Sequence, residues 1–335
     1  MKASTIIILV AMFAAPIRLI AGIDPPRALT FGVNSIPTNS FDPNNPAGFG
    51  YQLVFADDFD SLTSIDVNGS LSPTFKWYTT PFFQPASKFT PSLIAINNGI
   101  LTLESTPSST RNANIATAAP AKNLQGWVGK TFGGGGYFEA KIAFDPATVD
   151  TKNGWPSFWS MGIEHMAGKG ADQWQGQVKD YSHFIEDDFF EYLSASFAGQ
   201  NSYAATMHDW YGIWKITCLP AAFCNINNHS AGVSKFKNAI IKSNVSIDWT
   251  QFHVIGQLWV PSNNVNKIGY VQNYFDGIPT SKVSWNMATN LMPPPQGDFI
   301  FSIMDTSHLV VILGTGVKQP LHVDWVRVWQ LGTTN

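Results

Sequence analysis

Short runs in which apolar and polar side chains alternate recur along most of the chain. They are YQLVFADDF, GILTLES, GGYFEAKIAF, FFEYLSASF, FHVIGQLWV, IGYVQNYFDG, FIFSIMD and LHVDWVRVWQ, and residues typical of turns separate them. Such alternation is the pattern of half-buried β-strands. We find no long helical periodicity and no internal repeat. The pattern predicts an all-β domain over about residues 51–331, built as a sandwich of two antiparallel sheets.

Three segments break this pattern. Residues 23–50 are rich in Pro, Asn and Gly, and we predict an extended leader there. Residues 163–182 and 212–243 interrupt the strand-like runs within the domain. We expect these two insertions to be surface loops beside the cleft, if the sandwich has one.

The composition supports an all-β domain and excludes one class of partner. Apolar residues make up 44% of the 335 residues and charged residues only 13%, against a usual charged share of about 25%. The chain has 12 Trp, 24 Phe, 27 Gly and 21 Pro, a mixture that suits strands joined by many turns. Its formal net charge of −3 gives no basic surface, so we expect no nucleic-acid partner.

The N-terminus has the features of a secretory signal peptide. Lys2 precedes an apolar run from Ile6 to Ala15, and small residues follow at Ala21 and Gly22. The run is shorter than the roughly 20 residues that cross a bilayer, so we predict a signal peptide over residues 1–22. An uncleaved anchor or a misplaced start is the alternative. The prediction implies a secreted protein, extracellular or, in a bacterium, periplasmic, with no membrane attachment after cleavage.

The two cysteines lie close together in CLPAAFC. In an oxidising compartment Cys218 and Cys224 are predicted to form one local disulfide, and two free buried thiols are the alternative. Glycosylation sequons occur at Asn68, Asn228 and Asn244, and they matter only in a eukaryotic host.

The stretch HFIEDDFFEYLS concentrates acids in an aromatic, strand-like run. Strand alternation sends Glu186 and Asp188 to one face and Asp187 to the other. Unbroken alternation would turn Glu191 away from the first two. One extra residue, a β-bulge at Phe189 or Phe190, would return Glu191 to their face. We therefore predict an inner strand over residues 184–193 that is bulged at this point.

Three interpretations of this acidic face remain open from the residues themselves. Acidic clusters are usually solvated faces or cation sites, and a calcium site is one possibility because hard cations take carboxylate oxygens. Calcium loops are normally rich in Gly and Asn, however, and this stretch is rich in Phe. The third interpretation is glycoside hydrolysis, in which one carboxylate attacks the sugar and another transfers the proton. Asp187, on the opposite face of the strand, is expected to be merely structural.

A set of ordered motifs supports the hydrolytic interpretation. The pattern E-x-D-x-x-E, with Glu186, Asp188 and Glu191, resembles the signature of glycoside hydrolase family 16 in its bulged form. GGYFEAKIAF, GWPSFWSMG, FHVIGQLWVPS, YFDGIPT and LHVDWVRVWQ resemble other segments of that family, in the expected order. The resemblance implies that residues 51–331 form a catalytic domain. It also implies a concanavalin A-like β-jelly-roll whose concave sheet forms a glycan cleft.

The resemblance assigns roles to the acids and to a possible ion site. It makes Glu186 the nucleophile, Glu191 the general acid/base and Asp188 an assisting carboxylate. It implies no required cofactor, but it matches Asp324 and the carbonyl group of Gly99 to a structural calcium site found in many members.

Four further residues are matched to the cleft. They are Trp155 and Trp159 of the GWPSFWSMG segment, and His208 and Trp210 of the following TMHDWY strand. Indole faces stack on sugar C–H surfaces, although a core tryptophan and a buried, hydrogen-bonded histidine are the competing interpretations.

The sequence leaves several functions open. The resemblance implies a monomeric, secreted retaining endo-β-glycosidase acting on a polysaccharide, with a β-1,3- or β-1,3-1,4-glucan expected first. A galactan hydrolase or transglycosylase of the same fold is the alternative within the enzymes. A glycan-recognition protein without catalysis and a calcium-dependent structural sandwich are the others. The long segment between Trp159 and Glu186 and the cysteine-bearing insertion depart from a simple laminarinase pattern, which leaves the substrate open.

Overall fold

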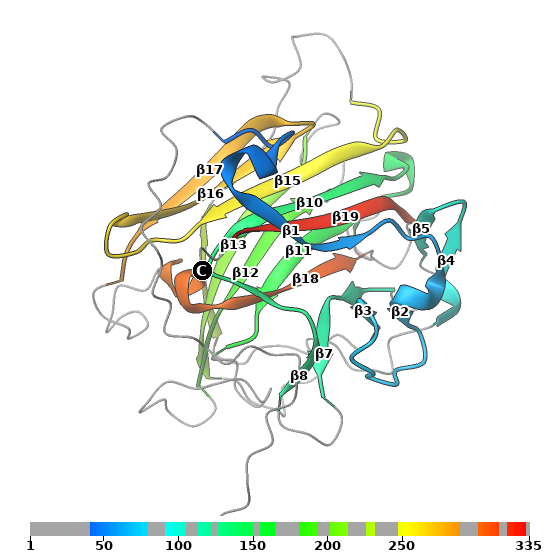
Figure 1. Cartoon of the computed structure of the whole chain (residues 1–335), viewed down its shortest axis with the longest axis horizontal. Coiled ribbons are helices and arrows are strands. Elements are labelled where there is room, and N and C mark those ends of the chain that lie inside the picture. Colours follow the sequence, from blue (N-terminus) through cyan, green and yellow to red (C-terminus); the bar gives the residue numbers. More distant parts are fainter. Residues whose placement is uncertain are drawn as a thin grey trace, which may run out of the picture.

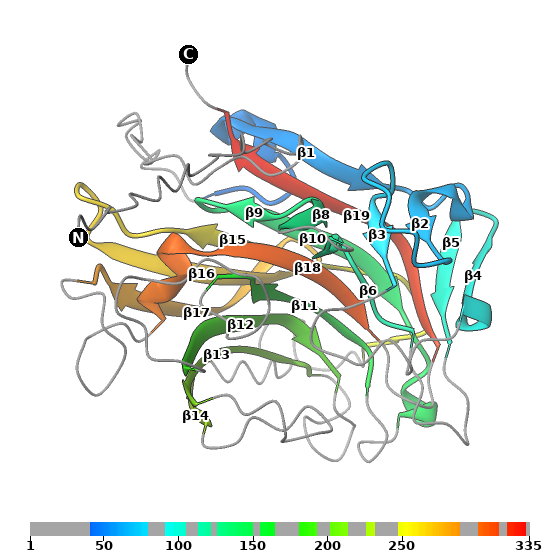
Figure 2. The same ribbon diagram turned by 90° about the horizontal axis from the view of Figure 1, so that it is seen from below.

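The chain folds as a β-jelly-roll of two stacked sheets (Figures 1 and 2), as predicted. The computed structural model describes residues 41–79, 91–104, 113–121, 126–149, 155–164, 181–192, 202–213, 226–231, 247–288, 301–314 and 320–332. Every strand pairing in these ranges is antiparallel except the short one between β2 and β3. No helix among the described residues has the length and apolar character needed to cross a membrane.

The two sheets are here named A and B. Sheet A has the order β17 (Ile278–Asn286), β16 (Ile268–Phe275), β15 (His253–Val260), β10 (Gly136–Ala143), β19 (Leu321–Leu331), β5 (Ile100–Leu103) and β4 (Ile94–Asn97), with β1 (Tyr51–Asp57) also paired to β19. Sheet B has the order β14 (Ile226–Ala231), β13 (Ala204–Ile213), β12 (Tyr181–Glu191), β11 (Ser157–Gly162), β18 (His308–Gly314), β6 (Ile115–Ala116), β3 (Trp77–Tyr78) and β2 (Ile65–Asp66), with β9 (Phe132–Gly133) paired to β18.

Smaller elements connect these strands. Strands β7 (Ala118–Pro120) and β8 (Trp127–Gly129) form a separate pair. The short 3₁₀ helices are η1 (Pro46–Phe49), η2 (Leu62–Ser64), η4 (Pro91–Leu93), η5 (Pro146–Thr148) and η6 (Ser302–Thr306).

The main hydrophobic core lies between the two sheets. Phe138 of sheet A stacks on Phe189 of sheet B with 5.3 Å between ring centroids, and Phe189 meets Phe158 of the neighbouring strand at 4.8 Å. Alternate residues of β10 and β19 fill the same layer from sheet A. Burial of these large side chains is the main favourable term in holding the two sheets together. The other face of each sheet therefore points outward, away from this core.

Two expected elements differ from the prediction. The run FIFSIMD was expected to be a strand, but it contains helix η6, and the strand is β18 in the next apolar run, HLVVILG. Phe301 has a φ of +58°, so the backbone leaves extended conformation just before η6. The insertion 212–243 is not only a loop, because residues 226–231 form β14 and pair with β13. The central part of the other insertion, residues 165–180, lies outside the described residues.

The described end of the leader is folded rather than extended. Asn45 caps helix η1 by accepting a hydrogen bond from the Gly48 amide at 3.2 Å, and Gly50 ends the helix with a φ of +83°. Phe41 packs on Tyr137 and Tyr274, with ring centroids 5.0 and 6.0 Å away. Residues 41–50 thus cover part of the outer face of sheet A. The predicted signal peptide, residues 1–22, lies outside the described residues.

Candidate active site

A β-bulge in β12 brings three acids to the outer face of sheet B, as predicted. Against β11, Phe158 pairs with Phe190 and Trp159 pairs with Asp188, so Phe189 is the extra residue. The register against β13 shifts between Asp188 and Glu191 by the same single residue. Phe189 and Phe190 are both fully buried in the core between the sheets. Because two consecutive side chains point inward, Glu191 returns to the face of Glu186 and Asp188.

Asp187 points the opposite way, into the core. Its side chain is fully buried, and its Oδ1 accepts a hydrogen bond from Nε2 of Gln257 on β15 of sheet A, at 3.1 Å. Burial raises the pKa of Asp187 to about 7, and the bond from Gln257 opposes the rise. The strand therefore carries acids on both faces.

Each catalytic candidate glutamate accepts a hydrogen bond from an indole N–H. Trp155 Nε1 donates to Glu191 Oε1 at 2.7 Å, and Trp210 Nε1 donates to Glu186 Oε2 at 2.8 Å. The family resemblance matched both tryptophans to the cleft, with a position in the core as the alternative for Trp155. In the structure their N–H groups hold the two carboxylates, a contact that the residue pattern gave no means of predicting.

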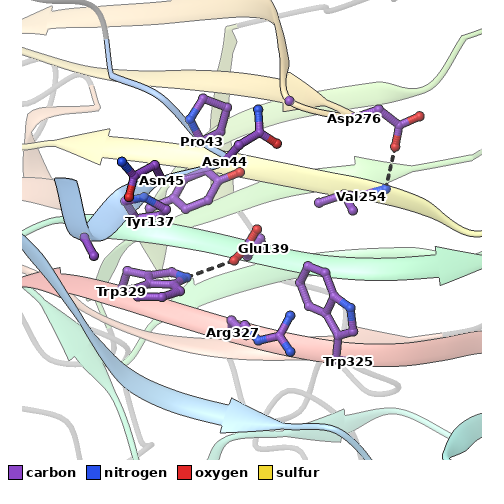
Figure 3. Close-up of a pocket in the computed structure, with 13 residues that line it drawn as sticks. Pro43, Asn44, Asn45, Tyr137, Glu139, Val254, Asp276, Trp325, Arg327 and Trp329 are labelled. Atoms are coloured by element: carbon purple, nitrogen blue, oxygen red, sulfur yellow. Dashed lines mark hydrogen bonds between the residues drawn. The ribbon is translucent and has the colours of Figure 1, made fainter. Parts of the chain in front are cut away.

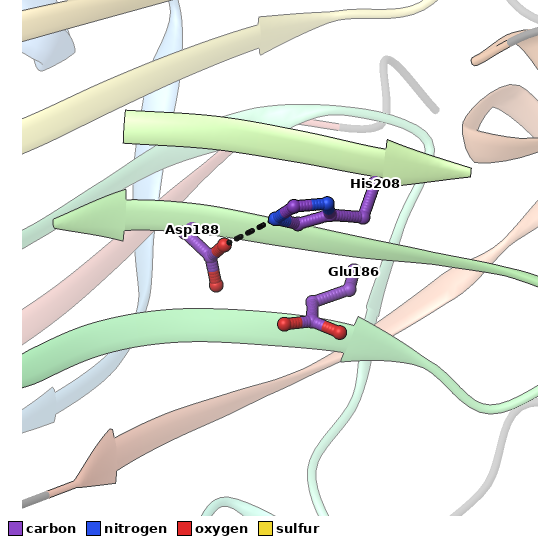
Figure 4. A group of neighbouring side chains, drawn as sticks. All are labelled: Glu186, Asp188 and His208. Carbon is purple, nitrogen blue, oxygen red and sulfur yellow. Dashed lines mark ion pairs between the residues drawn. The ribbon is translucent and has the colours of Figure 1, made fainter. Parts of the chain in front are cut away.

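His208 lies beside the acids on the neighbouring strand, as expected of a cleft residue. It pairs with Glu186 across the β12–β13 ladder, and its Nε2 lies 3.3 Å from Asp188 Oδ2 (Figure 4). The imidazole also stacks on Trp210, with ring centroids 5.7 Å apart and planes inclined by 28°. The His208 ring is therefore held between Asp188 of β12 and Trp210, which lies on the same strand as His208.

An apolar patch continues the outer face beside the acids. It consists of Ala116, Ala118, Trp127, Met161, Ile163, Phe184, Val310 and Ile312, with the partly buried Trp159 and Trp210 packed against it. Trp159 is paired with Asp188 across the β11–β12 ladder, which places this indole next to the acidic group. Partly exposed indoles beside carboxylates are a surface suited to the apolar faces and hydroxyl groups of a sugar.

The pKa values of all three acids are raised, first of all because the three are buried. Burial, followed by the nearby Glu191 charge, raises the pKa of Glu186 to about 7, while the Trp210 bond opposes the rise. Burial likewise raises the pKa of Glu191, against the bonds from Trp155 and Asp188. The pKa of Asp188 is well above its usual range, because of burial and then its two glutamate neighbours. The environment of all three acids thus favours the protonated form, a shift of the kind that acid/base groups in enzymes show.

The same side chains could also hold a cation. Glu186, Asp188 and His208 each offer a ligand atom, and these atoms lie within 4.8 Å of one another. Two carboxylates and one imidazole form a donor set that divalent transition metals accept. Glu191 is not one of these donors, so a cation site would not need it. The hydrolytic interpretation does need Glu191, as the general acid/base.

The predicted calcium ligands lie far from this site, on sheet A. Strand β5 follows Gly99 and pairs with β19, which carries Asp324. The Asp324 carboxylate forms an ion pair with Lys141 Nζ at 2.7 Å. Calcium takes about 6–8 oxygen ligands, so an ammonium on the expected carboxylate ligand is a poor fit to that ion. Calcium binding stays a prediction, and so does the disulfide, because Cys218 and Cys224 lie outside the described residues.

Comparisons with known proteins find similarity in fold. No protein-family model and no curated protein matches the chain. A β-glucanase of Bacillus licheniformis is 13% identical with a TM-score of 0.37, and the match covers 83% of this chain and 97% of that one. The alginate lyase Aly36B is 12% identical with a TM-score of 0.36, covering 73% and 86%. The exoplasmic/lumenal domain of VIP36 is 7% identical with a TM-score of 0.33, covering 72% and 83%.

Proposed function

We propose that this chain is a retaining endo-β-glycosidase that cleaves a polysaccharide by double displacement, in the manner of glycoside hydrolase family 16. One observation carries the proposal. The bulge in β12 gathers Glu186, Asp188 and Glu191 on one face, and each glutamate has its own indole donor. A solvated acidic face would need neither the bulge nor the donors.

In the first step Glu186 attacks the anomeric carbon of the bound sugar. The bond from that carbon to the leaving oxygen breaks, and Glu191 gives its proton to that oxygen. The indole N–H of Trp210 stabilises Glu186 as a carboxylate, which is the form that attacks. Glu191 begins protonated, and its raised pKa serves that need.

In the second step the roles of the acids reverse. Glu191, now ionised, takes a proton from a water molecule, whose oxygen attacks the anomeric carbon and releases Glu186. The Trp155 N–H bond stabilises the ionised Glu191 during this interval. Asp188 is hydrogen-bonded to Glu191 and lies next to His208, so it tunes the proton affinity of the pair without touching the anomeric carbon.

A β-1,3- or β-1,3-1,4-glucan is the substrate we propose first, and a galactan with hydrolysis or transglycosylation is the alternative. Trp155, Trp159, His208 and Trp210 are the residues proposed to contact sugar in the cleft. We further propose that the protein is secreted as a monomer, after removal of residues 1–22.

A substrate panel tests the proposal. Laminarin, barley β-glucan, lichenan, agarose, carrageenan and xyloglucan are incubated with the enzyme, and new reducing ends and product lengths are measured. We expect internal cleavage of a glucan, with products that retain the β configuration by NMR. Inverted products would exclude the two-step mechanism. Binding to a glycan without any cleavage would favour a recognition protein, and activity that a chelator abolishes would favour the cation site.

A further inference from the structure

A hollow lies on the outer face of sheet A, on the side of the sandwich opposite the acids. It has a volume of about 530 Å³, within the range of about 300–1,000 Å³ that small-ligand sites occupy. Its floor is formed by outward side chains of β10 and β19, and its walls by residues 43–47 and the Asp276–Gly277 turn (Figure 3). Asn44 packs closely on Gly277, where an added Cβ would lie 2.8 Å from its Nδ2.

A buried carboxylate forms part of this floor. Glu139 is only 8% exposed, yet it forms no ion pair within the described residues. Its Oε1 accepts a hydrogen bond from Trp329 Nε1 at 2.8 Å, and burial raises its pKa. Its other oxygen has no hydrogen-bond partner in the described part of the chain. Arg327, opposite Glu139 on β19, attracts this carboxylate without forming a hydrogen bond or ion pair to it, and opposes the rise in its pKa. The second oxygen of Glu139 is therefore an acceptor that a hydroxyl group can use.

The remaining lining is aromatic and nearly balanced in charge. Trp325 and Trp329 lie on either side of Arg327 along β19 (Figure 3). The Arg327 guanidinium lies 4.1 Å from the centre of the Trp325 ring and pairs with Asp58 at 3.0 Å. Asp276 is bound by His253 and by the Val254 amide. The hollow thus has no uncommitted cation for an anionic ligand, but it has indole surfaces, a free carboxylate oxygen and the Asn44 amide.

We propose that this hollow is a second, non-catalytic glycan-binding site that takes a neutral oligosaccharide. Indole surfaces provide area for the apolar face of a sugar ring. Glu139 and Asn44 provide hydrogen-bond partners for hydroxyl groups at its edge. Such a site would hold a polymer on the side of the enzyme away from the cleft. The choice of a β-glucan as the oligosaccharide rests on the proposed function.

The test counts binding sites in a chain that binds without cleaving. Laminarihexaose and a mixed-linkage β-glucan hexasaccharide are titrated calorimetrically into the Glu186→Ala variant, where we expect two sites per chain. Adding Trp325→Ala should weaken the second site about tenfold or more, leaving one site detectable. Glu139→Gln keeps an acceptor for Trp329 but loses the charge, and should weaken the same site about fivefold.

Tyr270→Ala is the matched control. Tyr270 lies on β16 of the same sheet and does not line the hollow. Its ring makes a cation–π contact with Lys282, whose Nζ lies 3.7 Å from the ring centre. It should leave both sites intact, and thermal unfolding verifies that each variant is folded. A single site in Glu186→Ala, or two unchanged sites after Trp325→Ala, would overturn the inference. If the wild type hydrolyses the glucan but Glu186→Ala binds at one site only, this inference is overturned and the proposed function stands. If two sites are found but the wild type hydrolyses nothing, the proposed function is overturned and this inference stands.

Discussion

Strand β12 carries acids on both faces, and their surroundings differ. Burial raises the pKa of outward Glu186 and of inward Asp187 to about 7 in each case. Glu186 has charged neighbours, an indole donor and partial exposure on the outer face. Asp187 is sealed between the sheets, and its one hydrogen bond comes from the amide of Gln257. A raised pKa therefore does not distinguish the proposed catalytic acid from Asp187, whereas access and acidic neighbours do.

The largest expected effect is the loss of activity in Glu186→Ala, compared with a change on the inner face of β12. Glu186→Ala removes the proposed nucleophile, so we expect kcat to fall by about 10⁴-fold or more. Glycan binding should be largely retained, because the indoles and His208 remain. Asp187→Asn is the matched change on the inner face and should retain most of the activity. Reducing-end assays of both variants on the best polysaccharide test this, and equal losses would show that the distinction between the faces is wrong.

Glu191→Ala should have the next largest effect, and one that depends on the leaving group. General acid assistance is worth about 10²–10⁴-fold, so hydrolysis of the polysaccharide should fall by that factor. Activity on an activated aryl glycoside should fall less, since its leaving group needs no proton. Added azide should restore turnover and give a β-glycosyl azide. If azide instead rescued Glu186→Ala with retained configuration, the roles of the two glutamates would be reversed.

The indole donors should tune the outward acids in a way that pH profiles detect. Trp210→Phe removes a bond to Glu186, so the pKa of Glu186 rises and the acidic limb of kcat/KM moves to higher pH. Trp155→Phe raises the pKa of Glu191 instead, which moves the basic limb to higher pH. A hydrogen bond to a charged group is worth about 1.5–3 kcal/mol, so kcat/KM should fall about tenfold or more.

A third indole–carboxylate pair provides the control for these variants. Trp329 donates to Glu139 at 2.8 Å on the outer face of sheet A, away from the acids. Trp329→Phe should leave both limbs of the profile unchanged when a short aryl glycoside is the substrate. Movement of either limb in this control would mean that the shifts arise from general loss of packing.

The acidic face could be predicted from the sequence because strand alternation is a local property. The spacing of Glu186, Asp188 and Glu191 requires one extra residue, and the two phenylalanines between the acids supply it. The partners of the acids could not be predicted in this way. Trp155 lies just before β11 and Trp210 lies on β13, and the direction of an indole N–H depends on packing that no periodicity encodes. Strand β18 was missed because two apolar runs stand side by side there, and only the second pairs with β11.

The contact between Asp187 and Gln257 also could not be predicted from the sequence, because Gln257 lies on a strand of the other sheet. The Asp187–Gln257 contact leaves one oxygen of each side chain, Asp187 Oδ2 and Gln257 Oε1, buried without a hydrogen-bond partner. Buried acceptors without a donor are costly. A proton on Asp187 Oδ2 removes the charge and turns this oxygen into a donor. Asparagine at position 187 has nearly the same shape as that protonated acid, is neutral at every pH, and likewise offers one acceptor oxygen and a donor.

Asp187→Asn is therefore expected to have the smallest effect on activity, and its main effect should be on stability. The folded-state pKa of Asp187, about 7, exceeds its unfolded value of 3.8. The proton is thus bound more tightly in the folded protein, and this contribution to the free energy of unfolding is lost as pH rises from about 4 to 7. One such group contributes a slope of up to about 1.4 kcal/mol per pH unit. In urea titrations at several pH values, Asp187→Asn should match the wild type near pH 4 and be more stable by an increasing margin up to pH 7. A constant difference across that range would show that Asp187 does not carry the proton.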